Sequence, residues 1–314
     1  MFTNISGVMP VRNGLKFLPR SRAIIEQILA TGDELIIVDD GSTDESYAFL
    51  RRWEKENSQV HLIKNNSQGL VNALNLGIKE SKNSWIARFD VDDIYPTNRL
   101  SIQRAAIDEG VGAIFSDYEM IDSNNMSLGI LPSPVESHAT SISLINGNRT
   151  PHPSVLFSKA AYHSAGGYRV EDFLVEDLSL WLRMSRESQL ISIPQVLLQY
   201  TIHSKSITIS KGLEMRANKK NLLKTIGIYE QDLSYCLYNS ENIFAIYKDK
   251  GYVGKRNMSY IYDLLTLFKL GFLSRKTFKP NVTVILNEVI KLENFKAVFS
   301  LSKEKIIRDK IRKF

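Results

Sequence analysis

The chain has 314 residues, of which 43% are hydrophobic and 24% charged, so it can bury a sizeable core and is not a disordered polymer. A single cysteine, Cys236, excludes an internal disulfide framework and is typical of a reducing compartment. Residues 1–7 lack the features of a signal peptide, and there is no uninterrupted apolar run of about 18 residues. These features predict a cytoplasmic protein without a membrane-spanning helix.

The net charge of +6 is unevenly distributed. Residues 210–314 contain 21 Lys and Arg against 10 Asp and Glu, whereas residues 1–209 contain 19 against 24. An acidic body followed by a basic region indicates two parts with different roles. We therefore expect a catalytic domain over residues 1–209 and a basic helical C-terminal region over residues 210–314.

Strands and helices alternate along the first ninety or so residues. Expected strands cover 6–9 (stopped by Pro10), 34–38, 60–63 and 85–89, and expected helices cover 15–30, the segment begun by a capping box at Ser42–Glu45, and the segment after Gly69. This alternation predicts a parallel, doubly wound α/β sheet. We expect residues 1–110 to form a nucleotide-binding half and residues 111–209 an acceptor half.

Polar clusters follow three of these strands, at residues 10–13, 39–40 and 90–93. Ligands bind beyond the carboxyl ends of the strands in such sheets, so the three clusters predict one site. In the third, Asp90, Asp92 and Asp93 repel one another unless a cation lies among them. Because no glycine-rich phosphate-binding motif is present, a hard divalent metal that carries a diphosphate is the expected ligand.

The acceptor half is expected to contain a strand over 112–116 and a polar surface loop over 122–148. The segment Thr150–Phe157 contains the next expected strand, and we interpret His152 as a structural histidine packed beside prolines. The apolar spacing of Leu178, Trp181 and Leu182 predicts a helix with Glu176 and Asp177 in its first turn. A last strand is expected over 195–202.

The order and spacing of these motifs resemble a known family. The segments Val8–Gly14, Ile37–Asp44, Gln68–Asn75 and Asp90–Asp93 are similar to the successive motifs of the family-two inverting glycosyltransferases of GT-A fold, bacterial polysaccharide type. The resemblance continues in Glu176–Arg183 and covers about two thirds of the chain. It implies a GT-A catalytic domain, with a Rossmann-like, mostly parallel sheet flanked by helices, and a C-terminal helical extension.

The resemblance also implies roles for individual residues. Nucleotide-sugar contacts are expected from the segment Pro10, Val11, Arg12 and Asn13, and from Asp40, Gly69, Asn75 and Asp90. Asp92, with Asp90, is expected to bind Mg²⁺ or Mn²⁺ as in a D-x-D motif. His203 is either a further metal ligand or a surface histidine in a loop. Leu74 departs from the family pattern, because many relatives carry Arg there.

The segment around Glu176 and Asp177 resembles the family's E-D motif, which supplies the catalytic base. We assign the base to Asp177, with Glu176 as the alternative. A carboxylate there can take the proton of a sugar hydroxyl as the new C–O bond forms, in one displacement that inverts the anomeric centre. Metal ligation would offset the charge that grows on the leaving diphosphate.

These features predict a metal-dependent inverting hexosyltransferase. It would move a sugar from a UDP- or dTDP-activated donor to a hydroxyl of a glycan acceptor, lipid-linked, in surface-polysaccharide biosynthesis. The alternatives are a sugar nucleotidyltransferase, which would release diphosphate, and a non-catalytic relative that acts as a binding subunit.

Residues 210–314 show mainly helical patterns, and residues 298–314 resemble a cationic amphipathic helix. Two interpretations stay open: peripheral docking on the anionic cytoplasmic face of the inner membrane, and a helical subdomain with a solvated basic surface. Nucleic-acid binding is not expected, because the chain lacks a recognised reading motif.

Overall fold

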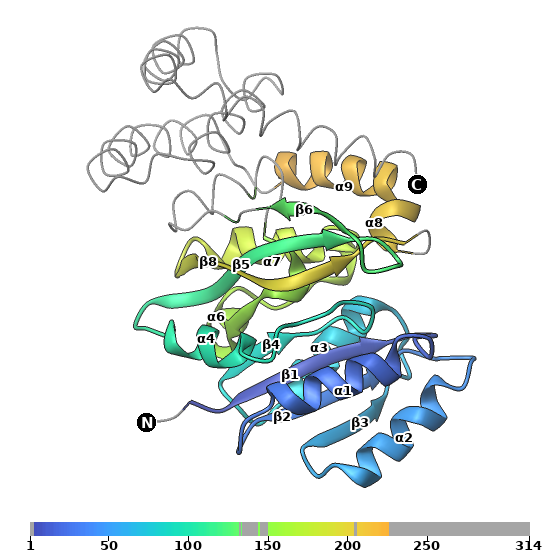
Figure 1. The fold of residues 1–314 in the computed structure, drawn as a ribbon. Helices are drawn as coiled ribbons and strands as arrows, with labels where there is room; N and C mark the ends of the chain where they lie inside the picture. The colour runs from blue at the N-terminus through green and yellow to red at the C-terminus, as the bar shows by residue number, and fades with distance from the viewer. Residues whose placement is uncertain (1–2, 132, 134–143, 145–149, 204–205, 226–314) are drawn as a thin grey trace, which may run out of the picture.

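The computed structural model describes residues 3–131, 133, 144, 150–203 and 206–225 (Figure 1). Most of the expected loop over 122–148 and the predicted helices beyond residue 225 lie outside the described residues, so the interpretations of the basic C-terminal region stay predictions. Among the residues that are described, no helix has both the length and the apolar character needed to cross a bilayer.

One mixed sheet of eight strands forms the centre of the described structure. Its order is β3-β2-β1-β4-β7-β5-β6, with β8 paired to β5. The strands are β1 (Ile5–Val11), β2 (Glu34–Asp39), β3 (Val60–Lys64), β4 (Trp85–Arg88), β5 (Val111–Ile121), β6 (Ser127–Leu131), β7 (Leu156–Ser158) and β8 (Gln189–Thr201).

The first four strands are parallel to one another, which confirms the doubly wound arrangement predicted for this part of the chain. The expected end of the first strand at Pro10 is wrong, because β1 continues to Val11 and Pro10 pairs with Val38 of β2. Proline is tolerated there because the pairing of β1 with β4 already ends at Val8, so no ladder bond to β4 needs the missing N–H.

The remaining strands are not a continuation of the parallel pattern. β7 is antiparallel to β4 and β5, β6 is antiparallel to β5, and β8 is parallel to β5. The expected surface loop over 122–148 is wrong in part, because β6 lies within it and both Ser133 and Leu144 are buried. The expected strand at His152 begins later, since His152–Ser154 forms a 3₁₀ turn, η1, ahead of β7.

Helices cover both faces of the sheet (Figure 1). α1, α2 and α4 pack on one face, and α3, α6 and α7 pack on the other. Their bounds are α1 (Leu18–Ile28), α2 (Ser46–Glu56), α3 (Leu70–Glu80), α4 (Arg99–Ala105), α6 (Lys159–Ser164), α7 (Glu176–Met184), α8 (Ile207–Ser210) and α9 (Gly212–Thr225), with the short 3₁₀ turn η2 at Val170–Asp172.

Two expected helix starts are wrong. α1 begins at Leu18 rather than Leu15, with Pro19 in its first turn, where proline costs no helical hydrogen bond. The predicted capping box at Ser42–Glu45 does not form, because α2 begins at Ser46 without a side-chain cap. The hydroxyl of Ser42 instead accepts a hydrogen bond from the main chain of Asn13.

The first residues of the predicted C-terminal region pack on the residues that precede them. Leu222 of α9 is buried and belongs to the same hydrophobic core cluster as residues of α7, and the Asn218 side chain donates to the Phe173 main-chain oxygen at 3.1 Å. The ammonium of Lys211 lies 5.0 Å from the centre of the Phe173 ring. The packing of residues 210–225 thus continues that of the preceding residues, while the domain boundary at residue 209 stays a prediction.

Candidate active site

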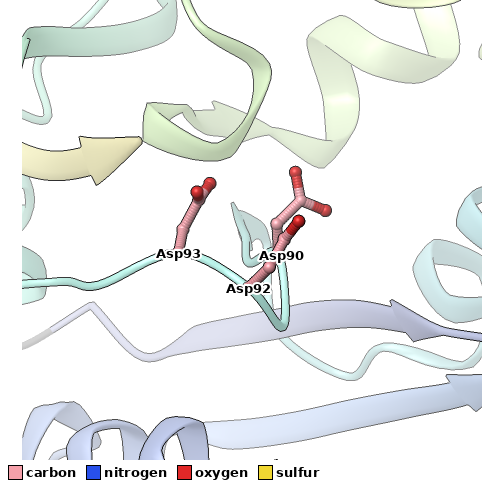
Figure 2. Close-up of side chains that lie close together, drawn as sticks. All are labelled: Asp90, Asp92 and Asp93. Carbon is pink, nitrogen blue, oxygen red and sulfur yellow. The ribbon is translucent and has the colours of Figure 1, made fainter. Parts of the chain in front are cut away.

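The loop after β4 carries the three acids that the sequence places at a strand end. One carboxylate oxygen from each of Asp90, Asp92 and Asp93 lies within 4.8 Å of the others. Figure 2 shows the three side chains rising on the same side of the loop. Asp93 is buried, whereas Asp90 and Asp92 are partly exposed.

Each of the three carboxylates has a different anchor. The guanidinium of Arg88 donates to Asp90 at 2.5 Å. Asp93 accepts from the main-chain N–H of Thr201, at the end of β8, at 2.8 Å, and its second oxygen has no partner among the described residues. One carboxylate oxygen of Asp92, Oδ2, lies 2.8 Å from Nε2 of His203.

These environments suit a divalent cation. Burial raises the pKa of Asp90, and the nearby Asp92 adds to this, although the Arg88 guanidinium opposes it. Burial together with Asp92 and Asp90 raises the pKa of Asp93 well above its usual range. Clustered carboxylate oxygens, one of them buried without a partner, form the donor set that Mg²⁺ and Mn²⁺ prefer. The residues present therefore fit the predicted metal, and His203 lies beside them.

A second acidic pair lies at the start of α7. Glu176 is buried and one of its oxygens has no partner among the described residues, whereas Asp177 is partly exposed and accepts from the Leu178 N–H at 2.6 Å. Burial, and then the charge of Asp177, raises the pKa of Glu176 to about 7. Leu174, two residues ahead, adopts φ 74°, a strained conformation that turns the chain into the helix.

One cavity of about 450 Å³ joins the two acidic groups. Asp90 and Asp92 line it from the loop after β4, and Glu176 and Asp177 line it from α7. The buried Arg88 also lines the cavity and is the cation that faces these acids from β4. Acids 85 residues apart in the chain (Asp92 and Asp177) thus border one space in the folded protein.

The rest of the cavity wall is largely apolar. Tyr118 of β5 and Tyr200 of β8 lie with their rings 6.5 Å apart and nearly perpendicular. The other apolar lining residues include Leu70, Met120, Phe173, Leu174, Ile202, Ile207 and Met215. The cavity therefore has an acidic part, suited to a metal and to proton transfer, and an aromatic and aliphatic part, suited to the apolar surface of a ligand.

The predicted nucleotide contacts lie near the carboxyl ends of β1 and β2. Pro10 lines the cavity. Asp40 is buried, and one of its oxygens accepts from the Gly69 N–H and from the Asn65 side chain, both at 2.7 Å. Gly69 has φ 98°, which a residue with a side chain rarely adopts, so glycine permits this N–H to reach Asp40. Asp40 thereby fixes the start of α3.

Other predicted nucleotide residues bind protein groups in this structure. The Asn13 side-chain oxygen accepts from the main chain of Thr43 at 2.8 Å and so holds the loop between β2 and α2. Asn75 accepts from the Tyr162 hydroxyl at 2.6 Å and donates to the Tyr168 main-chain oxygen at 2.9 Å. Val11 is buried and Arg12 is exposed. The roles of these residues toward a nucleotide stay predictions.

His152 has the packed environment expected of a structural histidine, and it also lines the cavity. Its Nε2 lies 2.7 Å from the hydroxyl of Tyr168, and its ring contacts Trp181 edge to face. Burial, and then the charge of Arg88, lowers the pKa of His152 well below its usual range. The imidazole is therefore neutral at physiological pH.

Sequence reasoning missed several residues of the site. In the sequence, Arg88 is a single charged residue within an apolar strand. Its ion pair with Asp90, seen in the folded structure, shows that it belongs to the site. Asp93 had no assigned role, yet it ties the acidic loop to β8. Tyr118 and Tyr200 lie on strands far apart in the chain, and no local pattern indicates that they border one cavity. Their register across β5 and β8 is a property of the folded sheet.

The fold and site define the class of protein. The structure resembles that of Staphylococcus aureus TarS (residues 1–349) in complex with UDP-GlcNAc, with a TM-score of 0.57 and 15% identity over 74% of this chain and 70% of TarS. It also resembles a mannosyltransferase from Pyrobaculum calidifontis in complex with GDP-Man and Mn²⁺, with a TM-score of 0.54 and 14% identity over 91% and 85% of the two chains. The fold is that of a GT-A glycosyltransferase.

The amino-acid sequence is similar to a known protein family and to curated glycosyltransferases. Residues 6–151 match the model of glycosyl transferase family 2. The chain is 28% identical over 210 residues to the Escherichia coli UDP-Glc:alpha-D-GlcNAc-diphosphoundecaprenol beta-1,3-glucosyltransferase WfaP, covering 65% of this chain and 79% of WfaP. It is 28% identical over 207 residues to the E. coli O-antigen biosynthesis glycosyltransferase WbnJ, covering 64% and 81%. Over residues 6–151 the chain is therefore similar to glycosyl transferase family 2, and it is a glycosyltransferase.

Proposed function

We propose that this protein is a metal-dependent, inverting glycosyltransferase. It transfers a sugar from a UDP- or dTDP-activated donor to a hydroxyl of a lipid-linked glycan acceptor during surface-polysaccharide biosynthesis. The observation that carries the proposal is the single cavity bordered by the acids after β4 and by the acid pair of α7. One set is suited to hold the leaving diphosphate, and the other to deprotonate the acceptor.

On the donor side, Asp92 and Asp90 are the residues that would hold Mg²⁺ or Mn²⁺, with His203 as a further ligand. Such an ion, when bound, offsets the negative charge that grows on the leaving diphosphate. Pro10 to Asn13, Asp40, Gly69 and Asn75 are the proposed nucleotide-sugar contacts. Asp90 is aligned for this work by Arg88, whose guanidinium is itself buried.

On the acceptor side, we assign the catalytic base to Asp177. Its carboxylate would accept the proton of the acceptor hydroxyl while that oxygen bonds to the anomeric carbon and the bond to the diphosphate breaks. Glu176 is the weaker candidate, because its side chain is buried and one of its oxygens is enclosed, whereas Asp177 is partly exposed. A single displacement with no covalent link to the protein inverts the anomeric configuration.

The apolar part of the cavity supports an acceptor with a substantial apolar surface. Tyrosine rings receive the C–H face of a sugar, and the aliphatic residues around them suit an acceptor that is part of a larger amphiphile. WfaP acts on a diphosphoundecaprenol-linked acceptor and WbnJ in O-antigen biosynthesis, as their names state. We therefore infer a lipid-linked acceptor, used at the cytoplasmic face of the membrane.

Donor use can be tested with the full chain and a panel of UDP-, dTDP- and GDP-sugars, with Mn²⁺ and a short-chain GlcNAc-diphosphate lipid as acceptor probe. Nucleoside diphosphate release should require a UDP- or dTDP-sugar and should fall at least tenfold when EDTA removes the metal. The anomeric configuration of the product, read by NMR coupling constants, should be opposite to that of the donor.

Four results would contradict the proposal. Retention of the anomeric configuration would exclude the single displacement. Undiminished turnover in EDTA would exclude the metal. Release of diphosphate from a nucleoside triphosphate and a sugar phosphate would instead indicate the nucleotidyltransferase considered from the sequence. Lack of turnover with every donor, despite nucleotide binding, would favour a non-catalytic relative.

A further inference from the structure

The first turn of α1 contacts the main chain of the acidic loop. The Arg20 guanidinium donates to the main-chain oxygen of Asp92 at 2.5 Å, and the Ser21 hydroxyl donates to that of Val91 at 2.5 Å. Arg20 also donates to the side-chain oxygen of Asn125, in the turn between β5 and β6, at 3.0 Å. One guanidinium thus joins the acidic loop to a second segment of the chain.

Phe17, which directly precedes α1, stacks on the ring of His203. The two ring centroids lie 5.4 Å apart with planes inclined by 28°, and the Arg20 guanidinium lies 5.8 Å from the Phe17 centroid. His203 in turn lies against the Asp92 carboxylate, with 2.8 Å between Nε2 and the oxygen. These contacts form a closed circuit, whose members are Arg20, Asp92, His203 and Phe17.

Two features decide whether Asp92 and His203 could bind the same cation: the position of the acidic loop and the plane of the imidazole ring. A donor on the main-chain oxygen of Asp92 limits movement of the loop, in which neighbouring carboxylates repel one another. A stacked phenyl ring limits rotation of the imidazole. Neither Phe17 nor Arg20 lines the cavity, so both would act on the site through other residues.

We propose that Phe17 and Arg20 are positioning residues of the divalent-cation site. Arg20 fixes the main chain of Asp92, and Phe17 fixes the ring plane of His203, so that the carboxylate and the imidazole face one ion. This inference rests on the proposed function, in which Asp92 and His203 bind the cation. Residues that orient metal ligands without binding the metal themselves typically change metal affinity by about 10- to 100-fold.

The test is a titration of the full chain with Mn²⁺ alone, with free Mn²⁺ followed by electron paramagnetic resonance. We expect Arg20→Met and Phe17→Leu each to raise the Kd for Mn²⁺ about tenfold. The matched control is Arg22→Met on the same helix. Arg22 forms ion pairs with Glu26 at 3.1 Å and Glu56 at 2.7 Å, away from the acidic loop, so its Kd for Mn²⁺ should change less than about twofold.

A catalytic assay separates positioning from a loss of stability. Saturating Mn²⁺ should restore most of the kcat of Arg20→Met, because the weakened step is cation binding, while unfolding would not be reversed in this way. If Arg20→Met fails to fold, Arg20→Lys is the substitute. The lysine ammonium can still donate to the Asp92 main-chain oxygen, but it lacks the planar guanidinium that reaches Asn125 at the same time. An intermediate Kd for Mn²⁺ is therefore expected.

Asp92→Asn in the same titration separates this inference from the proposed function. Weaker Mn²⁺ binding in both Asp92→Asn and Arg20→Met supports the positioning role. Weaker binding in Asp92→Asn alone overturns that role and leaves the metal site standing. Unchanged binding in Asp92→Asn overturns both, because the cation would then lie elsewhere.

Discussion

The parallel half of the sheet and its mixed half contribute to the cavity in different ways. In the parallel half, β1, β2 and β4 end at the same edge, and the polar residues that follow each strand come together because of the topology. In the mixed half, Asp177 comes from a helix start and His203 from the end of β8. Their approach to the acids of the first half depends on long-range packing.

The difference teaches where substitutions should act. Side chains from the parallel half that we propose to contact the donor also stabilise the structure: Asp40 accepts from the Gly69 N–H, and Arg88 pairs with Asp90. Partly exposed acids from the mixed half, such as Asp177, can be changed with less structural consequence. Loss of catalysis should therefore separate from loss of stability between the two halves.

The largest expected effect is that of Asp177→Asn on catalysis. Asparagine keeps the size of the side chain but cannot take the acceptor proton, so kcat should fall by about 10²- to 10⁴-fold. The Kd for the nucleoside diphosphate should be unchanged, because the proposed donor contacts lie in the other half of the sheet. Stopped-time assays of nucleoside diphosphate release and calorimetric titration measure the two quantities. A kcat within a few-fold of the wild type would move the base to Glu176.

Arg88→Met should affect both stability and catalysis. It leaves Asp90 without its cation and the main-chain oxygen of Phe89 without a donor. Because Asp90 is 30% exposed and water can compensate in part, we expect a loss of about 2 kcal/mol in the free energy of unfolding. Urea denaturation measures this loss. Arg104→Met is the matched control, since Arg104 pairs with the buried Asp33 away from the cavity.

In the control, stability should fall while turnover per folded molecule stays near that of the wild type. In Arg88→Met, turnover per folded molecule should fall as well, because Asp90 is no longer oriented. Equal turnover in the two variants would contradict the assignment of Arg88 to the site.

Glu176→Gln should change the pH dependence of stability. The folded protein keeps the Glu176 proton up to a pKa of about 7, whereas the unfolded chain loses it near 4.5. The folded state thus binds more protons in this window, so the free energy of unfolding falls as pH rises from 4.5 to 7, by about 3 kcal/mol. Glutamine removes this fall. Urea denaturation of both proteins at pH 4.5, 6 and 8 gives the comparison, and parallel curves would show that Glu176 titrates normally.

The smallest expected effect is that of Asn13→Ala. The Asn13 oxygen accepts two main-chain hydrogen bonds, from Thr43 and Asp44, at an exposed turn. Its loss should cost about 1 kcal/mol in the free energy of unfolding. Asn72→Ala is the control, because the Asn72 side chain donates to the main-chain oxygen of Gln68, just before α3, and makes no other hydrogen bond among the described residues. If nucleotide affinity also falls in Asn13→Ala alone, the predicted contact of this segment with the donor is supported.

Much of the donor side was predictable from the sequence. Buried apolar strands that end in Asp40 or Asp90 indicate both the parallel sheet and the edge at which ligands bind, because the order of strands and helices constrains the topology. Errors in this half were local: Pro10 lies inside β1, and α2 has no capping box. Each error has the same cause. The local preference of a residue to end a strand or to begin a helix is weaker here than strand pairing or contacts within a loop.

The acceptor side was less predictable. β6 was hidden in a segment read as a loop, since a short edge strand with exposed positions has a weak pattern. The His152 segment forms a 3₁₀ turn, because the prolines on either side of His152 favour turns over strand pairing. The apolar wall formed by Tyr118 and Tyr200 comes from the register of β5 against β8, which side-chain periodicity within one strand does not specify.

The acidic loop after β4 was predictable in part from the sequence and depends in part on the tertiary structure. The sequence alone determined that three carboxylates follow a buried strand, because hydrophobicity and residue order are local properties. Only the tertiary structure decided which cations and donors surround them: Arg88 beneath Asp90, Thr201 on Asp93, and His203 and Arg20 on Asp92. These partners come from three other elements of the chain. They meet only because the whole sheet packs as it does, and no single segment of the sequence specifies that packing.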